Sequence, residues 1–178
     1  LTLLSLISAF LLFGLLQAVS NAFSAGADFV GASRLITQAR VSFTQSLPMR
    51  QLTQIERVPG VTAVSYQQWF GGIYQDPRNF FAQFAVDPDR LFAVYPEWKL
   101  SDAEKQRFRT IKASAIVGSQ LAKKFGWKVG DQVPLESTIW PTQDGNKTWT
   151  FEIAGIFGGI DADWEQRANL MYLNFSYF

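Results

Sequence analysis

The stretch from Ala115 to Leu135 constrains the fold more than any other part of the chain. It opens with a short apolar run that ends at a glycine, the form of a small buried strand. A helix follows that Ser119 can cap, with apolar positions on one face. Gly126 fits the left-handed position after a helix, and Trp127 is the apolar residue that packs back on it. The stretch therefore predicts a strand, a short helix, a tight turn and a second strand.

Residues 40–69 predict a strand–helix–strand unit. Its first strand starts at Arg40, and its helix is capped by Ser46. The Val-Pro-Gly sequence at 58–60 ends this helix, because proline cannot continue it. The second strand is expected over residues 61–69.

The remainder predicts mostly β structure with short helices. A strand is expected over residues 80–86, and a capping box at 101–104 starts a helix. The Asp-Gly-Asn turn at 144–146 indicates a hairpin with arms at 138–140 and 149–153. On the second arm, Trp149, Phe151 and Ile153 point to one face, and the glycine pair 158–159 ends it. A last strand is expected over residues 168–175. The fold class is therefore α+β.

An uncharged apolar run from Leu1 to Val19 opens the chain, and no charge occurs before Asp28. As a helix, this run would extend roughly 28 Å, close to the hydrocarbon thickness of a bilayer. A transmembrane helix, a cleaved signal peptide and a buried core helix are the three interpretations, and the first is favoured. The first two both lead out of the cytoplasm.

Composition excludes several classes of function. The net charge of +1 provides no basic face for nucleic acid. The chain has neither Cys nor His, so thiolate chemistry, imidazole-based triads and His-containing zinc sites are excluded. The Gly-Asn-Lys-Thr sequence at 145–148 lacks the glycine loop of a phosphate-binding motif, and a hairpin turn accounts for it better. No cofactor is expected.

Two groups of carboxylates are the best argument for an enzyme. Asp87 with Asp89, and Asp161 with Asp163 and Glu165, offer acid and base groups or ligands for a hard cation. However, both groups lie in turn or loop sequences, where solvated charge is the ordinary explanation. The loop interpretation is favoured.

Aromatic residues indicate a third class, a sugar- or peptide-binding module. A stacking platform can be built from Trp69, Phe70, Tyr74, Trp98 and Trp140. The competing interpretation places these rings in the core. The segment from Trp69 to Tyr74 is a candidate contact for a partner or cargo. Its two glycines have no side chains that could cover the rings of Trp69, Phe70 and Tyr74. The alternative is that these rings pin two subdomains together.

Four motifs occur in an order that resembles the MacB-like periplasmic core domain. This domain belongs to ABC transporter permeases of the macrolide-exporter, lipoprotein-release and FtsX type. The motifs are the apolar start at Leu1, the sequence Val58-Pro59-Gly60-Val61 with Ala63-Val64, the string IVG, LA, FGW and VGD between Ile116 and Asp131, and the strand FEIAGIF from Phe151 to Phe157.

The resemblance implies a transmembrane and stalk helix over residues 1–27 and an extracytoplasmic core domain over 28–178. Subdomains are expected at about 34–69 plus 166–178, and at about 70–165. Family members continue with a further strand–helix–strand unit and three more membrane helices, so we expect a fragment of a longer permease.

The resemblance also implies a function, that of a permease subunit in the bacterial inner membrane. Such a subunit transmits ATPase-driven movement to a periplasmic domain that exports or releases a substrate, and has no enzymatic activity itself. The implied partners are a cytoplasmic ABC ATPase, a second permease copy and a periplasmic protein. The alternative is a secreted carbohydrate- or peptide-binding module with a cleaved signal peptide.

Overall fold

The computed structural model describes residues 5–18, 34–40, 45–142 and 144–177, and it divides into two units, Leu1–Ala39 and Arg40–Phe178. In the first unit, residues 5–18 form a helix. Within the described ranges, no helix has the length and apolar character that crossing a bilayer requires. The predicted membrane span is therefore not confirmed, and its residues 1–4 and 19 lie outside the description, as do residues 20–27 of the predicted stalk.

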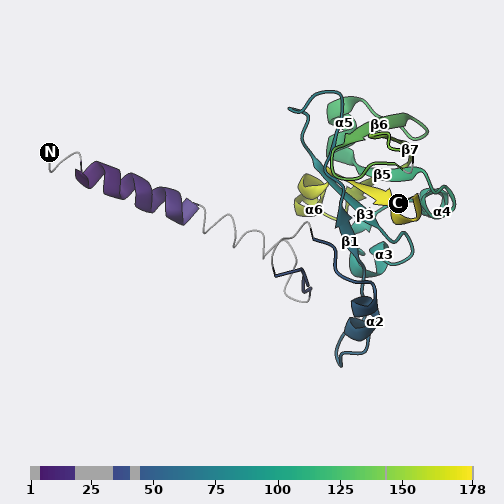
Figure 1. Ribbon diagram of the computed structural model, residues 1–178, viewed down its shortest axis with the longest axis horizontal. Helices are drawn as coiled ribbons and strands as arrows, with labels where there is room; N and C mark the ends of the chain where they lie inside the picture. Colours follow the sequence, from purple (N-terminus) through teal and green to yellow (C-terminus); the bar gives the residue numbers. More distant parts are fainter. Residues whose placement is uncertain (1–4, 19–33, 41–44, 143, 178) are drawn as a thin grey trace. The chain divides into compact units, whose positions relative to one another are not determined.

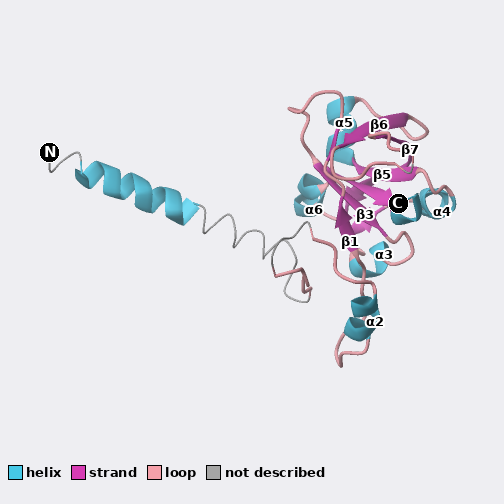
Figure 2. Cartoon of the chain, in the orientation of Figure 1, coloured by secondary structure: helices cyan, strands magenta, loops and turns pink. Residues whose placement is uncertain are grey.

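The second unit contains short helices and a sheet, as Figure 2 shows. Its helices are α2 (Arg50–Glu56), α3 (Leu91–Val94), α4 (Asp102–Thr110), α5 (Ser119–Phe125), α6 (Ala162–Arg167) and the 3-10 turn η1 (Phe175–Tyr177). Its strands are β1 (Gln67–Trp69), β2 (Gly72–Ile73), β3 (Ala82–Val86), β4 (Trp98–Lys99), β5 (Ser114–Gly118), β6 (Gln132–Ser137), β7 (Thr148–Gly159) and β8 (Leu170–Asn174). The predicted α+β class is confirmed for this unit.

Eight strands of the described chain form one mixed sheet. Seven follow the order β1-β3-β8-β5-β7-β6-β2, and β4 pairs with the end of β7. The β3–β8 and β5–β7 pairs are parallel, and the other pairs are antiparallel. The last strand of the described chain, β8, therefore lies in the middle of the sheet, between β3 and β5.

The sheet is covered on both faces, which explains its continuous apolar strands. Every residue of β5 and β8 is buried. One core cluster contains Phe151 with Leu121 of α5, and the other contains Leu91 of α3 and Phe108 of α4. In Figure 1, α4, α5 and α6 lie around the strands, whereas α2 stands apart beyond α3.

The predicted strand, helix, turn and strand are all present between β5 and β6. Gly126 ends α5 in the left-handed conformation, with φ of 70°, and Trp127 is buried behind it. The expectation that Ser119 caps the helix was wrong. Gly118 occupies the N-cap position, and the Ser119 hydroxyl instead donates to Glu165, whose carboxylate is the stronger acceptor.

The predicted strand–helix–strand unit is present only in part. Its first strand, apart from Arg40, falls mainly on residues 41–44, which lie outside the description. The expected cap was wrong, because α2 begins without a side-chain cap and the Ser46 hydroxyl donates to Gln68. The second strand covers only β1, whose partner β3 ends at Val86, opposite Gln67, and among the described residues no strand pairs with 61–66.

The hairpin of β6 and β7 is confirmed, with two corrections at its ends. β6 stops at Ser137, because the Ser137 hydroxyl accepts hydrogen bonds from the backbone N–H groups of Ile139 and Trp140 and turns the chain. β7 does not end before Gly158 and Gly159 but runs through them. A Cβ at Gly159 would lie 2.1 Å from the backbone nitrogen of Glu165, so the glycine lets α6 pack directly on the strand.

Candidate functional site

The segment from Gln67 to Ile73 joins the two ends of the sheet. β1 pairs with β3 at one end of the strand order, and β2 pairs with β6 at the other, yet only Phe70 and Gly71 separate them. The sheet must therefore curl until its two edges meet at this segment. We call this junction, residues 67–73, the seam. The candidate aromatic residues Trp69 and Phe70 lie within it, and Tyr74 follows it directly.

Phe70 lies in the core at this seam. Its side chain is fully buried, and its ring meets those of Trp149 and Phe151 edge to face at centroid distances of 6.1 and 5.7 Å. Gly72 makes room for it, because a Cβ at Gly72 would lie 2.6 Å from the Phe70 ring. The glycine pair thus lets aromatic rings pack against the backbone.

Gln83 completes the seam and was not identified from the sequence. Its side chain is fully buried on β3. The side-chain Nε2 donates to the Gly72 carbonyl at 2.8 Å, and Oε1 accepts from the Gly72 N–H at 2.7 Å. The sequence signal was a glutamine at an inward position of an apolar strand, where a buried amide requires specific partners.

Trp69 is half-buried and forms the base of an exposed apolar surface. Its ring meets Phe84 edge to face at 5.4 Å and lies 6.1 Å from Phe80, which is 72% exposed. Ile139 is 47% exposed, and a Cβ built at Gly71 would lie within 3 Å of both Ile139 and Trp69. We call Trp69, Phe80 and Ile139 the apolar patch.

Tyr74 is half-buried against an aromatic cluster on the other side of the seam. Its ring meets Phe125 at 5.2 Å and Trp127 at 4.9 Å, both edge to face. Its hydroxyl accepts hydrogen bonds from Trp127 Nε1 at 3.3 Å and from Gln75 Nε2 at 3.1 Å. Tyr74 therefore ties the seam to the end of α5.

The structure does not bring the five aromatic residues of the predicted stacking platform together. Trp98 is buried in the other core cluster, with Phe157 and Trp164. Trp140 lies near Trp69, and its Nε1 donates to the Trp69 carbonyl at 3.0 Å. Most of these rings serve packing.

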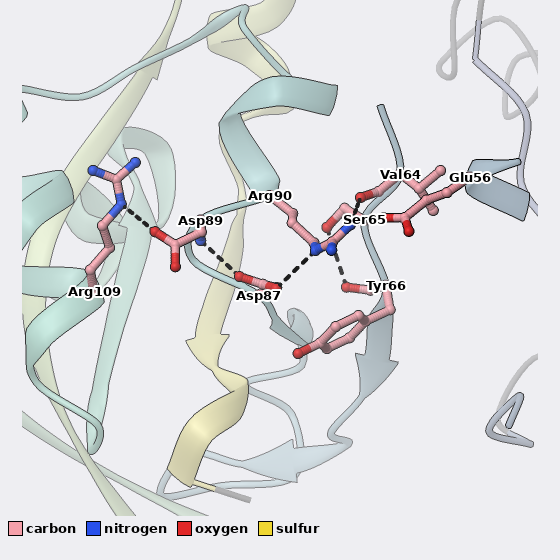
Figure 3. Close-up of polar contacts among 8 residues, drawn as sticks. All are labelled: Glu56, Val64, Ser65, Tyr66, Asp87, Asp89, Arg90 and Arg109. Atoms are coloured by element: carbon pink, nitrogen blue, oxygen red, sulfur yellow. Dashed lines mark hydrogen bonds and ion pairs between the residues drawn. The ribbon is translucent and has the colours of Figure 1, made fainter. Parts of the chain in front are cut away.

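Asp87 and Asp89 are engaged in ion pairs, as Figure 3 shows. Asp87 pairs with Arg90 at 3.3 Å, and its Oδ1 accepts from the Asp89 backbone N–H at 2.9 Å. Asp89 pairs with Arg109 at 2.9 Å. The hydrogen bond to Glu56 and the nearby carboxylates raise the pKa of Arg90 above its ordinary value. These carboxylates organise a turn.

The second carboxylate group stabilises α6 and its neighbours. Asp161 is the N-cap, and its Oδ1 accepts from the Trp164 N–H at 2.9 Å. Glu165 accepts from the Ser119 hydroxyl and from the Gly159 N–H, and these hydrogen bonds hold the pKa of Glu165 below its ordinary value. Asp163 is exposed in the first turn. Within the described ranges, no group of acidic side chains is arranged to hold a metal ion.

Two surface cavities lie away from the segment Trp69–Tyr74. One, of about 400 Å³, is lined by residues around the start of α4, including Trp98, Lys99 and Glu104. The other, of about 320 Å³, lies between α2, residues 61–64 and α3, beside Arg90. Neither is lined by Trp69, Phe70 or Tyr74.

Comparison with known proteins gives one family. The sequence model of the MacB-like periplasmic core domain matches residues 2–178. Among solved structures, the chain is similar to a domain described as a "putative Permease protein" from Porphyromonas gingivalis, with 17% identity and a TM-score of 0.45. This match covers 71% of the chain and 56% of that structure. No curated protein sequence matches the chain.

Proposed function

Because the chain belongs to the family of MacB-like periplasmic core domains of ABC transporter permeases, we propose that it acts as the extracytoplasmic domain of a permease subunit. In this role it transmits ATPase-driven movement across the membrane so that a substrate is exported or released. The family match over residues 2–178 is the observation that carries the proposal. The family is a transporter component and not itself an enzyme, so we assign ATP hydrolysis to a separate cytoplasmic chain.

The packing of the second unit supports a role in transmitting force. Its central strands are buried on both faces, and close-packed interiors deform little under load. The segment at Phe70 and Gly72 adds contacts that hold the two sheet edges together. The sheet with the helices packed on its faces would therefore move as one piece under load.

We propose that residues 1–27 anchor the domain in the bacterial inner membrane and that residues 28–178 lie outside the cytoplasm. The support is the uncharged apolar run, part of which forms the helix over residues 5–18. Carbonate extraction of membranes from the native host tests the anchor. The protein should remain in the pellet, and its release into the soluble fraction would contradict the anchor.

We also propose that the seam carries a contact for a periplasmic partner or cargo. Phe70 is buried, so the contact would rest on Trp69 and Tyr74 at its two sides. The other members of the apolar patch, Phe80 and Ile139, extend this surface from Trp69. Exposed aromatic rings make strong anchors, because they bring large contact area at a small cost in rotamer entropy.

Purification from detergent-solubilised membranes of the native host tests the transporter assignment. A tagged full-length protein should bring down an ABC ATPase in near-stoichiometric amount, identified by mass spectrometry, and a second, differently tagged permease copy. A matched sample with an unrelated membrane protein carrying the same tag is the control. Recovery of the protein from membranes without any ATPase would overturn the proposed function.

A further inference from the structure

Among the described residues, helix α2 makes few contacts with the rest of its unit. None of its residues is buried, and its N-terminus has no side-chain cap. The apolar side chains of Met49 and Val58, at its two ends, are each 52% exposed. A helix of seven residues is not stable by itself in water, so its neighbours must hold it in place.

The segment that follows α2 is also outside the sheet. Residues 61–66 are not part of a strand, because β3 ends opposite Gln67. Tyr66 marks the point of attachment: its ring packs edge to face on Phe175 at 4.7 Å, and burial raises the pKa of its hydroxyl. We define residues 50–65 as the arm.

Arg90 connects the arm to the sheet (Figure 3). Its guanidinium pairs with Glu56 at the end of α2 and with Asp87 after β3, and it donates to the Val64 carbonyl at 3.4 Å. One side chain thus joins both halves of the arm to the turn that follows β3. The cavity of about 320 Å³ lies at this junction.

This connection is weak in water. The Arg90 and Glu56 side chains are 38% and 37% exposed, so solvent and salt screen their attraction. An element with little buried apolar area and exposed polar contacts opens at a lower free energy than the core. The arm meets both conditions, whereas β5 meets neither.

We propose that the arm opens as a unit from an intact sheet, and that Arg90 with Glu56 and Asp87 is the latch that sets how often it opens. Opening separates the two walls of the cavity, since Val64 and Glu56 move away from Arg90 and Ala93. This inference rests on the geometry alone and is independent of the proposed transport function.

Hydrogen exchange measured by mass spectrometry on the full chain tests the latch. Amides of α2 and of residues 61–65 should exchange faster than those of β5 in the wild type. Glu56→Gln should raise exchange in the arm by about two- to fivefold, the factor that corresponds to an exposed ion pair. Exchange in β5 should not change, because Glu56 is on the surface.

A second ion pair provides the control. Arg78 pairs with Asp76 at 2.9 Å on an exposed loop, so Arg78→Gln removes a comparable interaction elsewhere and should leave the arm unaffected. Added salt should speed exchange of the arm in the wild type but much less in Glu56→Gln. The proposal is overturned if the arm exchanges as slowly as β5, or if Glu56→Gln leaves its exchange rate unchanged.

Discussion

The side-chain amide of Gln83 forms both hydrogen bonds of an amide pair with the backbone of Gly72, at 2.7 and 2.8 Å. Gln83 therefore does with its side chain what a neighbouring strand does with its backbone. The pair lies where β1 gives way to β2 and the partner strand changes from β3 to β6. It bridges the one interruption in the curled sheet at this seam.

Replacing Gln83 by leucine should destabilise the protein by about 2 to 6 kcal/mol, because two buried backbone groups lose their partners at about 1 to 3 kcal/mol each. Urea unfolding followed by tryptophan fluorescence measures this change. Gln132→Leu is the matched control, since Gln132 is exposed on β6. Equal midpoints for the two variants would show that the amide pair contributes little.

We expect substitutions of two phenylalanines at and beside the seam to have opposite effects on stability. Phe70→Ala should lower the free energy of unfolding by about 3 to 5 kcal/mol, since its ring is fully buried. Phe80→Ser should melt like the wild type, because its ring is 72% exposed. If the apolar patch contacts a partner, Phe80→Ser should still reduce substrate export or partner capture in cells. Normal export by a well-expressed Phe80→Ser variant would remove the patch from the contact surface.

Gly126→Ala should cost about 1 kcal/mol, and a valine at this position more, because φ is 70°. No atom lies within 4 Å of a Cβ built there, so the cost comes from the backbone alone. Gly126→Asn is the informative control, since asparagine tolerates the left-handed conformation better. Thermal melts of the three variants should rank Asn, Ala and Val from most to least stable; an alanine variant as stable as the wild type would refute this explanation.

The lowered pKa of Glu165 leads us to expect that the stability of the protein depends on pH. Hydrogen bonds from the Ser119 hydroxyl and the Gly159 N–H lower the pKa of Glu165 in the folded protein below the ordinary 4.5. The unfolded chain then binds the proton more readily, so this stabilisation is present above pH 4.5 and is lost as the pH falls through the folded pKa. Glu165→Gln should therefore have a lower melting temperature than the wild type at pH 7. The difference in melting temperature should narrow as the pH is lowered.

Asp163→Asn is the control for this pH dependence, because Asp163 lies exposed in the same helix. The difference in melting temperature between Asp163→Asn and the wild type should be small at every pH. A Glu165→Gln gap that stays constant from pH 7 to pH 3 would mean that the charge of Glu165 does not matter for folding.

Local signals in the sequence were reliable where a few neighbouring residues determine the conformation. The capping box of Ser101 and Glu104 and the left-handed Gly126 follow from short-range sterics and hydrogen bonding, and both are present. The alternation of Trp149, Phe151 and Ile153 likewise predicted the buried face of β7.

Features that depend on distant residues were not predictable in the same way. The end of β1 is determined by the end of β3, and the role of Ser119 by Glu165, which is 46 residues away. The candidate site shows the same limit. The sequence left open whether the Phe70 ring is a contact surface or part of the packing, because its burial follows from the curl of the sheet, which brings Trp149 and Phe151 to it.

The central position of β8 has a consequence for synthesis on the ribosome. β3 and β5 both pair with β8 and are not neighbours of each other in the strand order, so their facing edges have no partner strand until β8 arrives. A nascent chain that has emerged only as far as β7 leaves the facing edges of β3 and β5 unpaired, and unpaired strand edges are prone to aggregation. Folding of this unit is therefore expected to wait until Leu170–Asn174 has left the exit tunnel, which makes it late and cooperative rather than stepwise along the chain.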